Sequence, residues 1–390
     1  MKSGLLSPRI DITAFARCRG ARDVRNANGE EGKMIPRSDI VSRIWQDDRR
    51  LFRFVPLLFA SSVYRAGITL WNHAYDAGIR HASRMPCPVI SVGNIMVGGT
   101  GKTPMVIMLA RMLQEHGWKP AVLSRGYGGK RKAPAAVVSD GHEILTGPEE
   151  GGDEPVLMGR SLPGVPVIVA RDRSRAGRVA VDRFQADVLI LDDGFQHRRL
   201  ARDMDIVLLD AGRPFGNGFI LPRGGMREPP AALRRADVVV MTSTEEEGAP
   251  PPDGIPPIPV FSARRRPVAL VQGPTNEISP LADLAGQKVC AFTGIAQPDS
   301  FRRILGPLCG GIVSFLPFPD HHAYTARDVE DIRQARRDSG VRILLTTEKD
   351  GIKLTRFPDF FKDVCLLRID MEIMPSRHEF EEHILTRLRQ

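Results

Sequence analysis

Short runs of Val, Ile and Leu alternate with helix-like segments from Pro86 onward, and this alternation limits the fold more than any other feature of the chain. Continuous apolar runs are typical of parallel strands, because helices cover both faces of such a sheet. The pattern therefore predicts an α/β fold with a mostly parallel sheet. The expected strands are residues 88–92, 121–124, 167–170, 188–192, 206–210, 238–242, 289–294, 313–318 and 343–347, and the expected helices are 101–116, 298–306 and 325–338.

The chain is longer than one ordinary domain, and a segment rich in Pro and Gly divides it. This segment, GAPPPDGIPPIP within residues 247–259, is typical of a linker. We predict a core α/β domain over residues 86–250 and a smaller C-terminal α/β domain over residues 265–390. Residues 1–33 lack apolar periodicity and the apolar core of a secretory signal, so we expect a disordered extension, with the functional chain beginning near Met34.

A short apolar stretch precedes the core domain, within an expected helical segment over residues 40–85. Its uninterrupted part, residues 54–64, is about half of the roughly 20 residues that a membrane-spanning helix needs. Arginines flank it, and Trp45 and Trp71 bracket it, as in helices that lie in a membrane interface. A buried packing helix explains the composition equally well. Arg65 argues against a full span.

A glycine-rich turn joins the first expected strand to the first expected helix, in the sequence SVGNIMVGGTGKTP over residues 91–104. Such a turn directs main-chain N–H groups and the helix dipole at a phosphate. The strict P-loop pattern fails at its first position, where Met96 stands, which leaves a compressed variant of the loop. Lys102 would reach the β- and γ-phosphates of ATP, and the Thr103 hydroxyl would ligate Mg²⁺. The expected ATP-binding residues are Gly98, Gly99, Thr100, Gly101, Lys102 and Thr103.

A second part of the nucleotide site is expected after a later strand, in the sequence VLILDDGFQHRRL over residues 188–200. Asp192 ends the apolar run, where a P-loop protein holds its metal ion directly or through water. Asp193 and His197 follow at the carboxyl end of the strand, where ligands bind in open α/β sheets. Two adjacent Asp residues can also form a helix cap, so this alternative stays open.

Three further polar clusters carry residue types that phosphoryl transfer to an alcohol requires. They are SRGYGG (residues 124–129) with Arg125 and Tyr127, GGDEP (151–155) with Asp153 and Glu154, and FPDHHAY (318–324) with Asp320, His321 and His322. The reaction needs a base for the hydroxyl and cations for the developing charge. An Asp–His pair that closes over the phosphate loop from the second domain could remove the hydroxyl proton, with the carboxylate orienting the imidazole.

The charge balance indicates an anionic partner. The chain has 55 Lys and Arg against 46 Asp and Glu, a net charge of +9, which suits nucleic acid, a phosphorylated metabolite or an anionic lipid surface. Its basic residues are scattered and form no nucleic-acid-binding motif, so we expect no nucleic-acid partner. Its five cysteines form no C-x-x-C pair, which argues against a zinc site or a disulfide framework.

The motifs together resemble those of the tetraacyldisaccharide 4′-kinase family, the lipid A 4′-kinases, from about residue 40 to the C-terminus. They are GNIMVGGTGKTP, SRGYGG, GGDEP, LDDGFQHR, PFGNGFILPRGGMREP, FPDHH and LLTTEKDGIKL. The resemblance implies transfer of phosphate from ATP, with Mg²⁺, to the 4′-hydroxyl of a tetraacyl disaccharide 1-phosphate, which forms lipid IVA in lipopolysaccharide biosynthesis. It also implies a P-loop core, a smaller C-terminal domain and an N-terminal membrane-docking helix at the cytoplasmic face of the inner membrane. We expect no obligate protein partner.

Roles for individual residues come from the same resemblance. Asp153 and His321 match the family's catalytic pair, with His322 as the lesser candidate for the imidazole. The implied metal-binding residues are Thr103, Asp192, Glu154 and Glu228. The implied substrate-binding residues are Arg125, Tyr127, Asp193, His197 and Arg227.

One other class of protein shares the compressed glycine loop: membrane-associated switch ATPases and GTPases that act on a protein partner. That hypothesis predicts nucleotide hydrolysis without a phosphorylated product, and it leaves FPDHH and PRGGMREP without a role. The motifs therefore favour the kinase. They predict neither an acyl-chain preference nor an oligomeric state.

Overall fold

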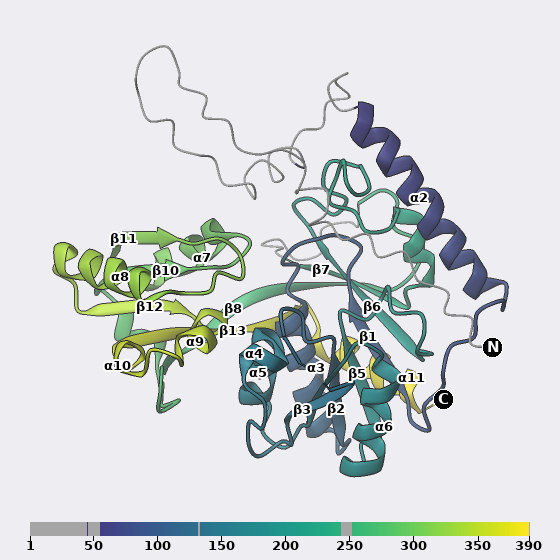
Figure 1. The fold of residues 1–390 in the computed structure, drawn as a ribbon, viewed down its shortest axis with the longest axis horizontal. Helices are drawn as coiled ribbons and strands as arrows, with labels where there is room; N and C mark the ends of the chain where they lie inside the picture. The colour runs from purple at the N-terminus through teal and green to yellow at the C-terminus, as the bar shows by residue number, and fades with distance from the viewer. Residues whose placement is uncertain (1–44, 46–54, 132, 243–251, 390) are drawn as a thin grey trace. The chain divides into compact units, whose positions relative to one another are not determined.

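One sheet runs through the described chain (Figure 1). The structure is a computed structural model that describes Trp45 and residues 55–131, 133–242 and 252–389. Its strands are β1 (Val89–Gly93), β2 (Pro120–Ser124), β3 (Ala135–Ser139), β4 (Val167–Ala170), β5 (Val188–Asp192), β6 (Met204–Asp210), β7 (Val238–Thr242), β8 (Val260–Gln272), β9 (Ile278–Ser279), β10 (Lys288–Thr293), β11 (Gly311–Pro317), β12 (Ile343–Thr347) and β13 (Val364–Met374). Their order is β11-β10-β12-β13-β8-β7-β6-β1-β5-β2-β4-β3, with β9 beside β8.

Helices and 3₁₀ turns connect and cover these strands. They are α2 (Val55–Asp76), α3 (Lys102–Glu115), α4 (Pro148–Gly151), α5 (Asp153–Ser161), α6 (Arg173–Phe184), η3 (Pro230–Arg235), η4 (Leu281–Leu284), α7 (Pro298–Leu305), η5 (Gly306–Leu308), α8 (Ala326–Ser339), α9 (Glu348–Leu354), α10 (Pro358–Phe361) and α11 (Arg377–Leu388).

The predicted α/β fold with a mostly parallel sheet is confirmed. Strands β2, β5, β1, β6 and β7 are parallel neighbours, as are β12, β10 and β11. The sheet also contains antiparallel pairs, β3 with β4, β8 with β9, and β8 with β13. Alternate side chains of β1 enter different apolar clusters, since Ile90 packs with α3 whereas Val89 packs with α6. Helices therefore cover both faces of the core sheet, as the continuous apolar runs predict.

The longest strands, β8 and β13, join the two predicted domains. Strand β8 begins parallel to β7 and then pairs with β13 along its length, from Ser262 opposite Met374 to Gln272 opposite Cys365. Strand β13 in turn pairs with β12. After β13 the chain returns to the core, where Phe380 and Ile384 of α11 share an apolar cluster with α3. The sheet is therefore continuous across the two domains that the sequence predicts on either side of residues 250–265.

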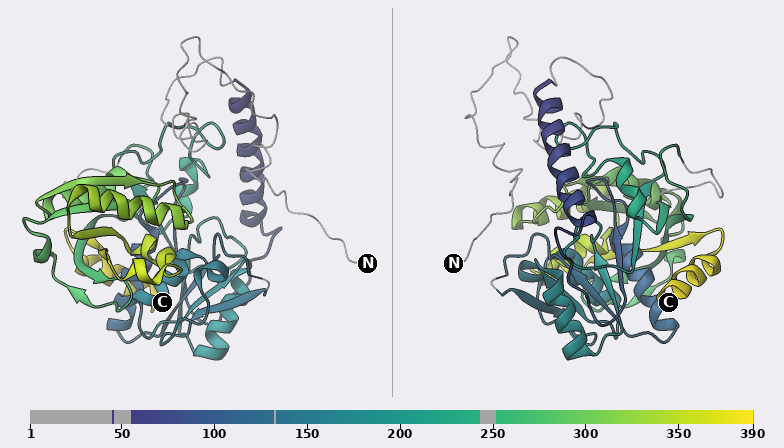
Figure 2. Two further views of the ribbon diagram at one scale, coloured as in Figure 1. Left: turned by 60° about the vertical axis from the view of Figure 1, so that its left-hand side comes forward. Right: turned by 90° about the vertical axis from the view of Figure 1, so that its right-hand side faces the viewer.

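Helix α2 contains most of the apolar stretch singled out in the sequence, and Figure 2 shows its first turns extending beyond the strands. One side of α2 contacts the protein, because Ser61 donates to the Ile220 carbonyl at 2.9 Å and Asn72 to the Glu228 carboxylate at 2.7 Å. The other side exposes large apolar side chains to solvent. Among the described helices, none is both long enough and apolar enough to cross a bilayer.

Some predictions concern residues outside those that the structure describes. They are the disordered extension over residues 1–33, the start of the helical segment at residues 40–44 and 46–54, and the first part of the linker at residues 247–251.

The return of α11 to the core gives a stability prediction. Phe380 is fully buried and packs edge-on against Phe261 at a centroid distance of 5.2 Å. Phe380→Ala should lower the free energy of unfolding by about 3–5 kcal/mol, because it leaves a cavity between α11 and the sheet. Urea unfolding measures this loss, and the exposed His378 of the same helix provides the control His378→Ala. Equal stability of the two variants would show that α11 does not complete the core.

Candidate active site

The glycine-rich turn has the conformation that a phosphate loop requires. It follows β1, and Gly101 precedes the first residue of α3 with a left-handed φ of 89°. A side chain at this position would be strained and would meet the Met371 methyl group, 2.7 Å from an added Cβ. A hydrogen bond stabilises the loop, because the buried Asn94 amide donates to the Thr100 hydroxyl at 3.0 Å. The N–H groups at the start of α3 are therefore held where they can bind phosphate.

Lys102 and Arg227 both contact the Asp193 carboxylate. The Lys102 Nζ lies 3.5 Å from Asp193 Oδ1, and Arg227 Nη1 donates to both carboxylate oxygens at 2.9 Å. Burial alone would raise the pKa of Asp193, but the two cations outweigh burial, so that this pKa is lowered. Asp193 is thus an ionised group that positions the lysine of the phosphate loop.

Asp192 has the environment expected of a metal ligand. Its Oδ2 accepts a hydrogen bond of 2.8 Å from Ser124, whereas its buried Oδ1 has no hydrogen-bond partner. Burial, and then the negative charges of Glu154 and Asp193, raise the pKa of Asp192 to about 7. A divalent cation would satisfy the free oxygen and offset these like charges. The Asp192 carboxylate therefore fits Mg²⁺, and Thr103, at the second residue of α3, offers the hydroxyl of the P-loop pattern.

The other two carboxylates implied as metal ligands have protein partners. Both oxygens of Glu228, which is fully buried, accept from Arg235 at 2.9–3.0 Å. Glu154 pairs with Lys349, whose Nζ lies 3.0 Å from Oε1. Within the described ranges, no three His, Cys, Asp or Glu side chains come together as a metal site by themselves. The metal-binding roles of Glu154 and Glu228 stay predictions.

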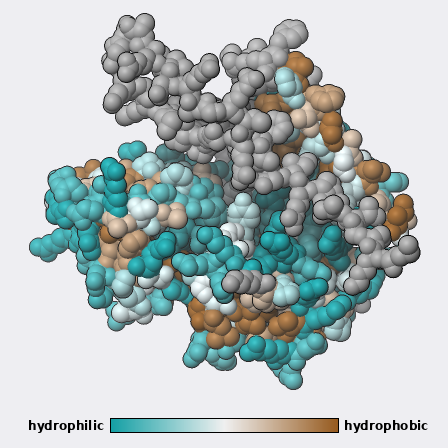
Figure 3. Space-filling view, viewed as in Figure 1, coloured by the Kyte–Doolittle hydropathy of each residue, from teal (hydrophilic) through white to brown (hydrophobic). Residues whose placement is uncertain are grey.

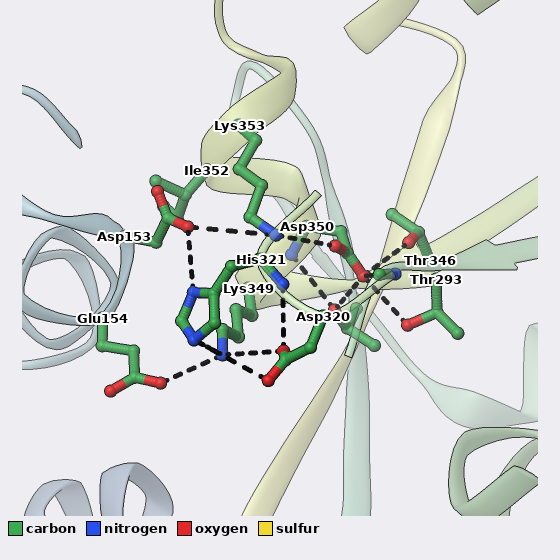
Figure 4. Close-up of polar contacts among 12 residues, drawn as sticks. Asp153, Glu154, Thr293, Asp320, His321, Thr346, Lys349, Asp350, Ile352 and Lys353 are labelled. Carbon is green, nitrogen blue, oxygen red and sulfur yellow. Dashed lines mark hydrogen bonds and ion pairs between the residues drawn. The ribbon is translucent and has the colours of Figure 1, made fainter. Parts of the chain in front are cut away.

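Asp153 and His321 lie together although the sequence places them in different predicted domains (Figure 4). Asp153 is the first residue of α5, and the distance from its Oδ2 to His321 Nδ1 is 3.8 Å. Gly152, with φ 90°, brings α5 so close to Tyr127 that an added Cβ would lie 2.6 Å from the Tyr127 carbonyl oxygen. His322 faces elsewhere, with Nε2 3.0 Å from Asp328. Of the two imidazoles, His321 is the one that faces Asp153.

Tyr127, Arg125 and His197, implied as substrate-binding residues, differ in exposure. Tyr127 is 72% exposed, with its ring 5.9 Å from the His321 ring, and Arg125 is also exposed. His197 Nε2 is buried without a hydrogen-bond partner. Burial, and then the neighbouring Arg173, lower the pKa of His197 from 6.5 to about 3. His197 is therefore neutral at physiological pH.

Two lysines at this site were not singled out from the sequence. Lys349 and Lys353 belong to α9, and Lys353 Nζ lies 3.9 Å from Asp153 Oδ2. Burial alone would lower the pKa of Lys349, but Glu154 and Asp320 reverse this effect and raise it. Both lysines belong to the LLTTEKDGIKL motif, to which the sequence argument gave no chemical role.

A phosphate loop, a buried carboxylate suited to Mg²⁺ and a carboxylate–imidazole pair define a nucleotide-dependent phosphotransferase of the P-loop class. Comparisons with known proteins specify the family. Residues 54–389 match the family described as tetraacyldisaccharide-1-P 4′-kinase. The tetraacyldisaccharide 4′-kinase of Syntrophus aciditrophicus is 48% identical, over 89% of this chain and 97% of that protein. The enzyme of the same name from Anaeromyxobacter sp. (strain Fw109-5) is 40% identical, over 88% of this chain and 94% of the relative.

A solved structure agrees with these sequence matches. The crystal structure of the "apo" form of LpxK from Aquifex aeolicus in complex with ATP is similar to this chain with a TM-score of 0.72. The two are 34% identical, and the match covers 86% of this chain and 98% of the other. This chain belongs to the tetraacyldisaccharide-1-P 4′-kinase family. The predicted family, P-loop type of fold and kinase class are confirmed.

The half-buried His197 gives a prediction about pH and stability. Its pKa is about 3 in the folded chain against 6.5 ordinarily, so the unfolded chain binds more protons between these values. Stability is therefore lost as the pH falls from about 6.5 toward 3. Between pH 7.5 and 5, the wild-type protein should lose about 2 kcal/mol more than His197→Gln does. Urea unfolding at the two pH values tests this, and parallel losses in the two proteins would contradict a His197 that is neutral in the folded chain.

Proposed function

We propose that this chain transfers the γ-phosphoryl group of ATP to the 4′-hydroxyl of a tetraacyl disaccharide 1-phosphate, which yields lipid IVA and ADP. The observation that supports the proposal is the approach of Asp153 to His321, 3.8 Å apart. Glu154, the next residue after Asp153, is close enough to Asp192 at the end of β5 to raise the pKa of that carboxyl. Membership in the 4′-kinase family supports the choice of the acceptor.

The phosphate loop provides the nucleotide side of the reaction. Main-chain N–H groups of residues 98–103 would bind the phosphates, and Lys102 would contact the β- and γ-phosphates. Thr103 and Asp192 would hold Mg²⁺, with Glu154 and Glu228 as further proposed ligands. The ion, when bound, neutralises charge on the β- and γ-phosphate oxygens.

The geometry supports Asp153, rather than His321, as the group that receives the hydroxyl proton. Its carboxylate faces His321 Nδ1, whereas the other ring nitrogen, Nε2, faces the Lys349 ammonium at 3.4 Å. We therefore assign the base to Asp153 and the orienting role to His321, the reverse of the order expected from the sequence. The 4′-hydroxyl proton passes to Asp153 Oδ2 as the oxygen attacks the γ-phosphorus, and the bond from that phosphorus to the leaving ADP oxygen breaks.

The remaining polar residues are suited to the acceptor. The exposed Tyr127 and Arg125 follow β2, and the Tyr127 ring lies 5.9 Å from the His321 ring. Asp193 contacts both Arg227 and Lys102, so these residues would join the acceptor side to the phosphate loop. His197 would serve as a neutral hydrogen-bonding group. We propose these five residues as the substrate-binding set.

The acceptor's acyl chains require that the enzyme work at a membrane, because each buried CH₂ costs about 0.8 kcal/mol to expose. Helix α2 is suited to this. Four large apolar side chains, at positions that share one side of a helix, are more than half exposed, and Figure 3 shows brown patches along α2. They are Val55, Phe59, Val63 and Leu70. We propose that this apolar stripe docks α2 on the cytoplasmic face of the inner membrane, without an obligate protein partner.

The kinase proposal is tested with Mg·ATP and a detergent-dispersed disaccharide 1-phosphate, following the mass of the lipid. The expected product carries one additional phosphate. Asp153→Ala should lower kcat at least 100-fold, the usual contribution of a general base, with little change in KM for ATP. ATP loss with an unchanged lipid would instead support a hydrolytic switch protein, and full turnover by Asp153→Ala would remove that residue from the chemistry.

The docking proposal is tested by flotation with vesicles that contain phosphatidylglycerol. Replacing Phe59 and Leu70 with Ser should weaken binding by roughly tenfold or more, because each side chain contributes about 1.5–3 kcal/mol when fully buried. The matched control is Ile278→Ser, an exposed apolar residue on β9. If the double variant floats as well as the control, α2 is not the docking element.

A further inference from the structure

Lys349 contacts the side of the His321 ring that faces away from Asp153 (Figure 4). Its Nζ lies 3.4 Å from His321 Nε2, and the opposite ring nitrogen, Nδ1, lies 3.8 Å from Asp153 Oδ2. The same Nζ lies 3.0 Å from Glu154 Oε1. One ammonium group thus contacts both the imidazole and the carboxylate next to the proposed base.

The chemistry of these groups selects one tautomer of His321. An ammonium group has three donors and no acceptor, so Lys349 can only donate toward Nε2. A neutral imidazole that accepts at Nε2 carries its single proton on Nδ1. That N–H then faces the Asp153 carboxylate, whose Oδ2 lies 3.8 Å from Nδ1. The hydrogen bond of Lys349 and the approach of Asp153 therefore favour the same tautomer.

The Asp320 carboxylate favours the other tautomer of His321. Its Oδ2 lies 3.8 Å from His321 Nε2, and a carboxylate there favours a proton on Nε2. Lys349 Nζ is closer to Nε2 than Asp320 Oδ2 is, and it also lies 3.7 Å from Asp320 Oδ1. Lys349 therefore both donates to Nε2 and offsets the charge that would otherwise attract a proton there.

A buried carboxylate fixes the position of Lys349. Thr347 precedes α9 and accepts a hydrogen bond from the Asp350 N–H at 3.1 Å, while its own hydroxyl donates to Asp350 Oδ2 at 2.8 Å. Asp350 is fully buried, and the same oxygen accepts from Thr293 at 2.9 Å. These bonds fix the first turn of α9, which carries Lys349.

The same carboxylate also fixes the backbone at His321. Asp350 Oδ2 accepts from the Gly294 N–H at 3.0 Å, and the Gly294 carbonyl accepts from the His321 N–H at 3.2 Å. His321 has a left-handed φ of 56°, a strained conformation for this residue type that persists only where the surroundings hold it. One buried group thus sets the separation between the imidazole and the ammonium.

We propose that Lys349 is a positioning residue, which holds His321 in the tautomer protonated on Nδ1 and so orients the ring toward Asp153. This inference deepens the proposed function, because it rests on Asp153 and His321 acting as the catalytic pair. It assigns a chemical role to the LLTTEKDGIKL motif, which forms the end of β12 and all of α9.

The tautomer is measured directly by long-range ¹H–¹⁵N correlation spectroscopy of ¹⁵N-histidine-labelled protein, with His321→Gln assigning the signals. The wild-type protein should show the proton on Nδ1. Lys349→Met should shift it to Nε2, beside Asp320, whereas Lys349→Arg should retain the wild-type pattern. The His322 signals should not change, because that ring pairs with Asp328. This readout requires no kinase activity.

Kinetics at saturating Mg²⁺ complete the test. Lys349→Met should lower kcat about tenfold or more while KM for ATP changes less than about twofold, and Lys349→Arg should restore most of kcat. The control is Lys362→Met, an exposed lysine that pairs with Asp359. Melting temperatures show whether each variant is folded.

Two failures are distinguishable. If the wild-type protein consumes ATP without phosphorylating the lipid, the proposed function fails whatever the spectra show. If Asp153→Ala retains full lipid phosphorylation, the kinase function stands, but the catalytic pair and with it the inference about Lys349 are overturned. If Asp153→Ala is inactive but Lys349→Met keeps either the wild-type tautomer or the wild-type kcat, the inference about Lys349 is overturned and the kinase proposal stands.

Discussion

The pairing of β8 with β13 is the constraint on which the rest of the structure depends. The first residues of β13 pair with β12. Farther along the strand, Asp370 pairs with Arg111 of α3 at 3.2 Å, and Met371 packs beside Gly101 of the phosphate loop. Because β13 pairs with β8 over ten residues, both predicted domains share one continuous sheet. Helix α9 lies in the connection from β12 to β13. The pairing of β13 with β8 therefore also determines that α9 lies beside α5.

The contact between α5 and α9 brings opposite charges together where a proton and a phosphoryl group are proposed to move. Asp153 and Glu154 begin α5, where the helix dipole favours carboxylates, and Lys349 and Lys353 come from α9. The raised pKa of Lys349 shows that its surroundings favour the charged form. In contrast, Asp192 has no cation within hydrogen-bond distance of Oδ1, and its pKa is raised. The site therefore contains two carboxylates that pair with lysines, Asp153 and Glu154, and a third, Asp192, that is suited to Mg²⁺.

Much of this arrangement could be predicted from the sequence, because continuous apolar runs mark buried parallel strands. Each expected strand is present, and the glycine-rich turn has the expected place before α3. Strands β8 and β13 were missed because ARRRP and RIDME interrupt their apolar residues, so neither has a continuous run. Their long pairing, and the return of α11 to the core, depend on contacts between distant parts of the chain that no local pattern encodes.

The same reason limited the prediction of the site. Asp153 and His321 were chosen together only through the family resemblance, since 168 positions of sequence separate them and spacing gives no contact. Lys349 and Lys353 had no distinguishing local pattern, because lysines in a short helix are usually solvated. Their role emerges only from the distances to Glu154, Asp153 and His321.

Asp153 and His321 are proposed to act as one unit in phosphoryl transfer. A double-mutant cycle of Asp153→Asn and His321→Gln, measured by single-turnover transfer from Mg·ATP to the disaccharide 1-phosphate, tests this coupling. The second substitution should add little once the first has been made, because both disable the same proton transfer. Rate losses that simply multiply would contradict the claim and show that the two residues act independently.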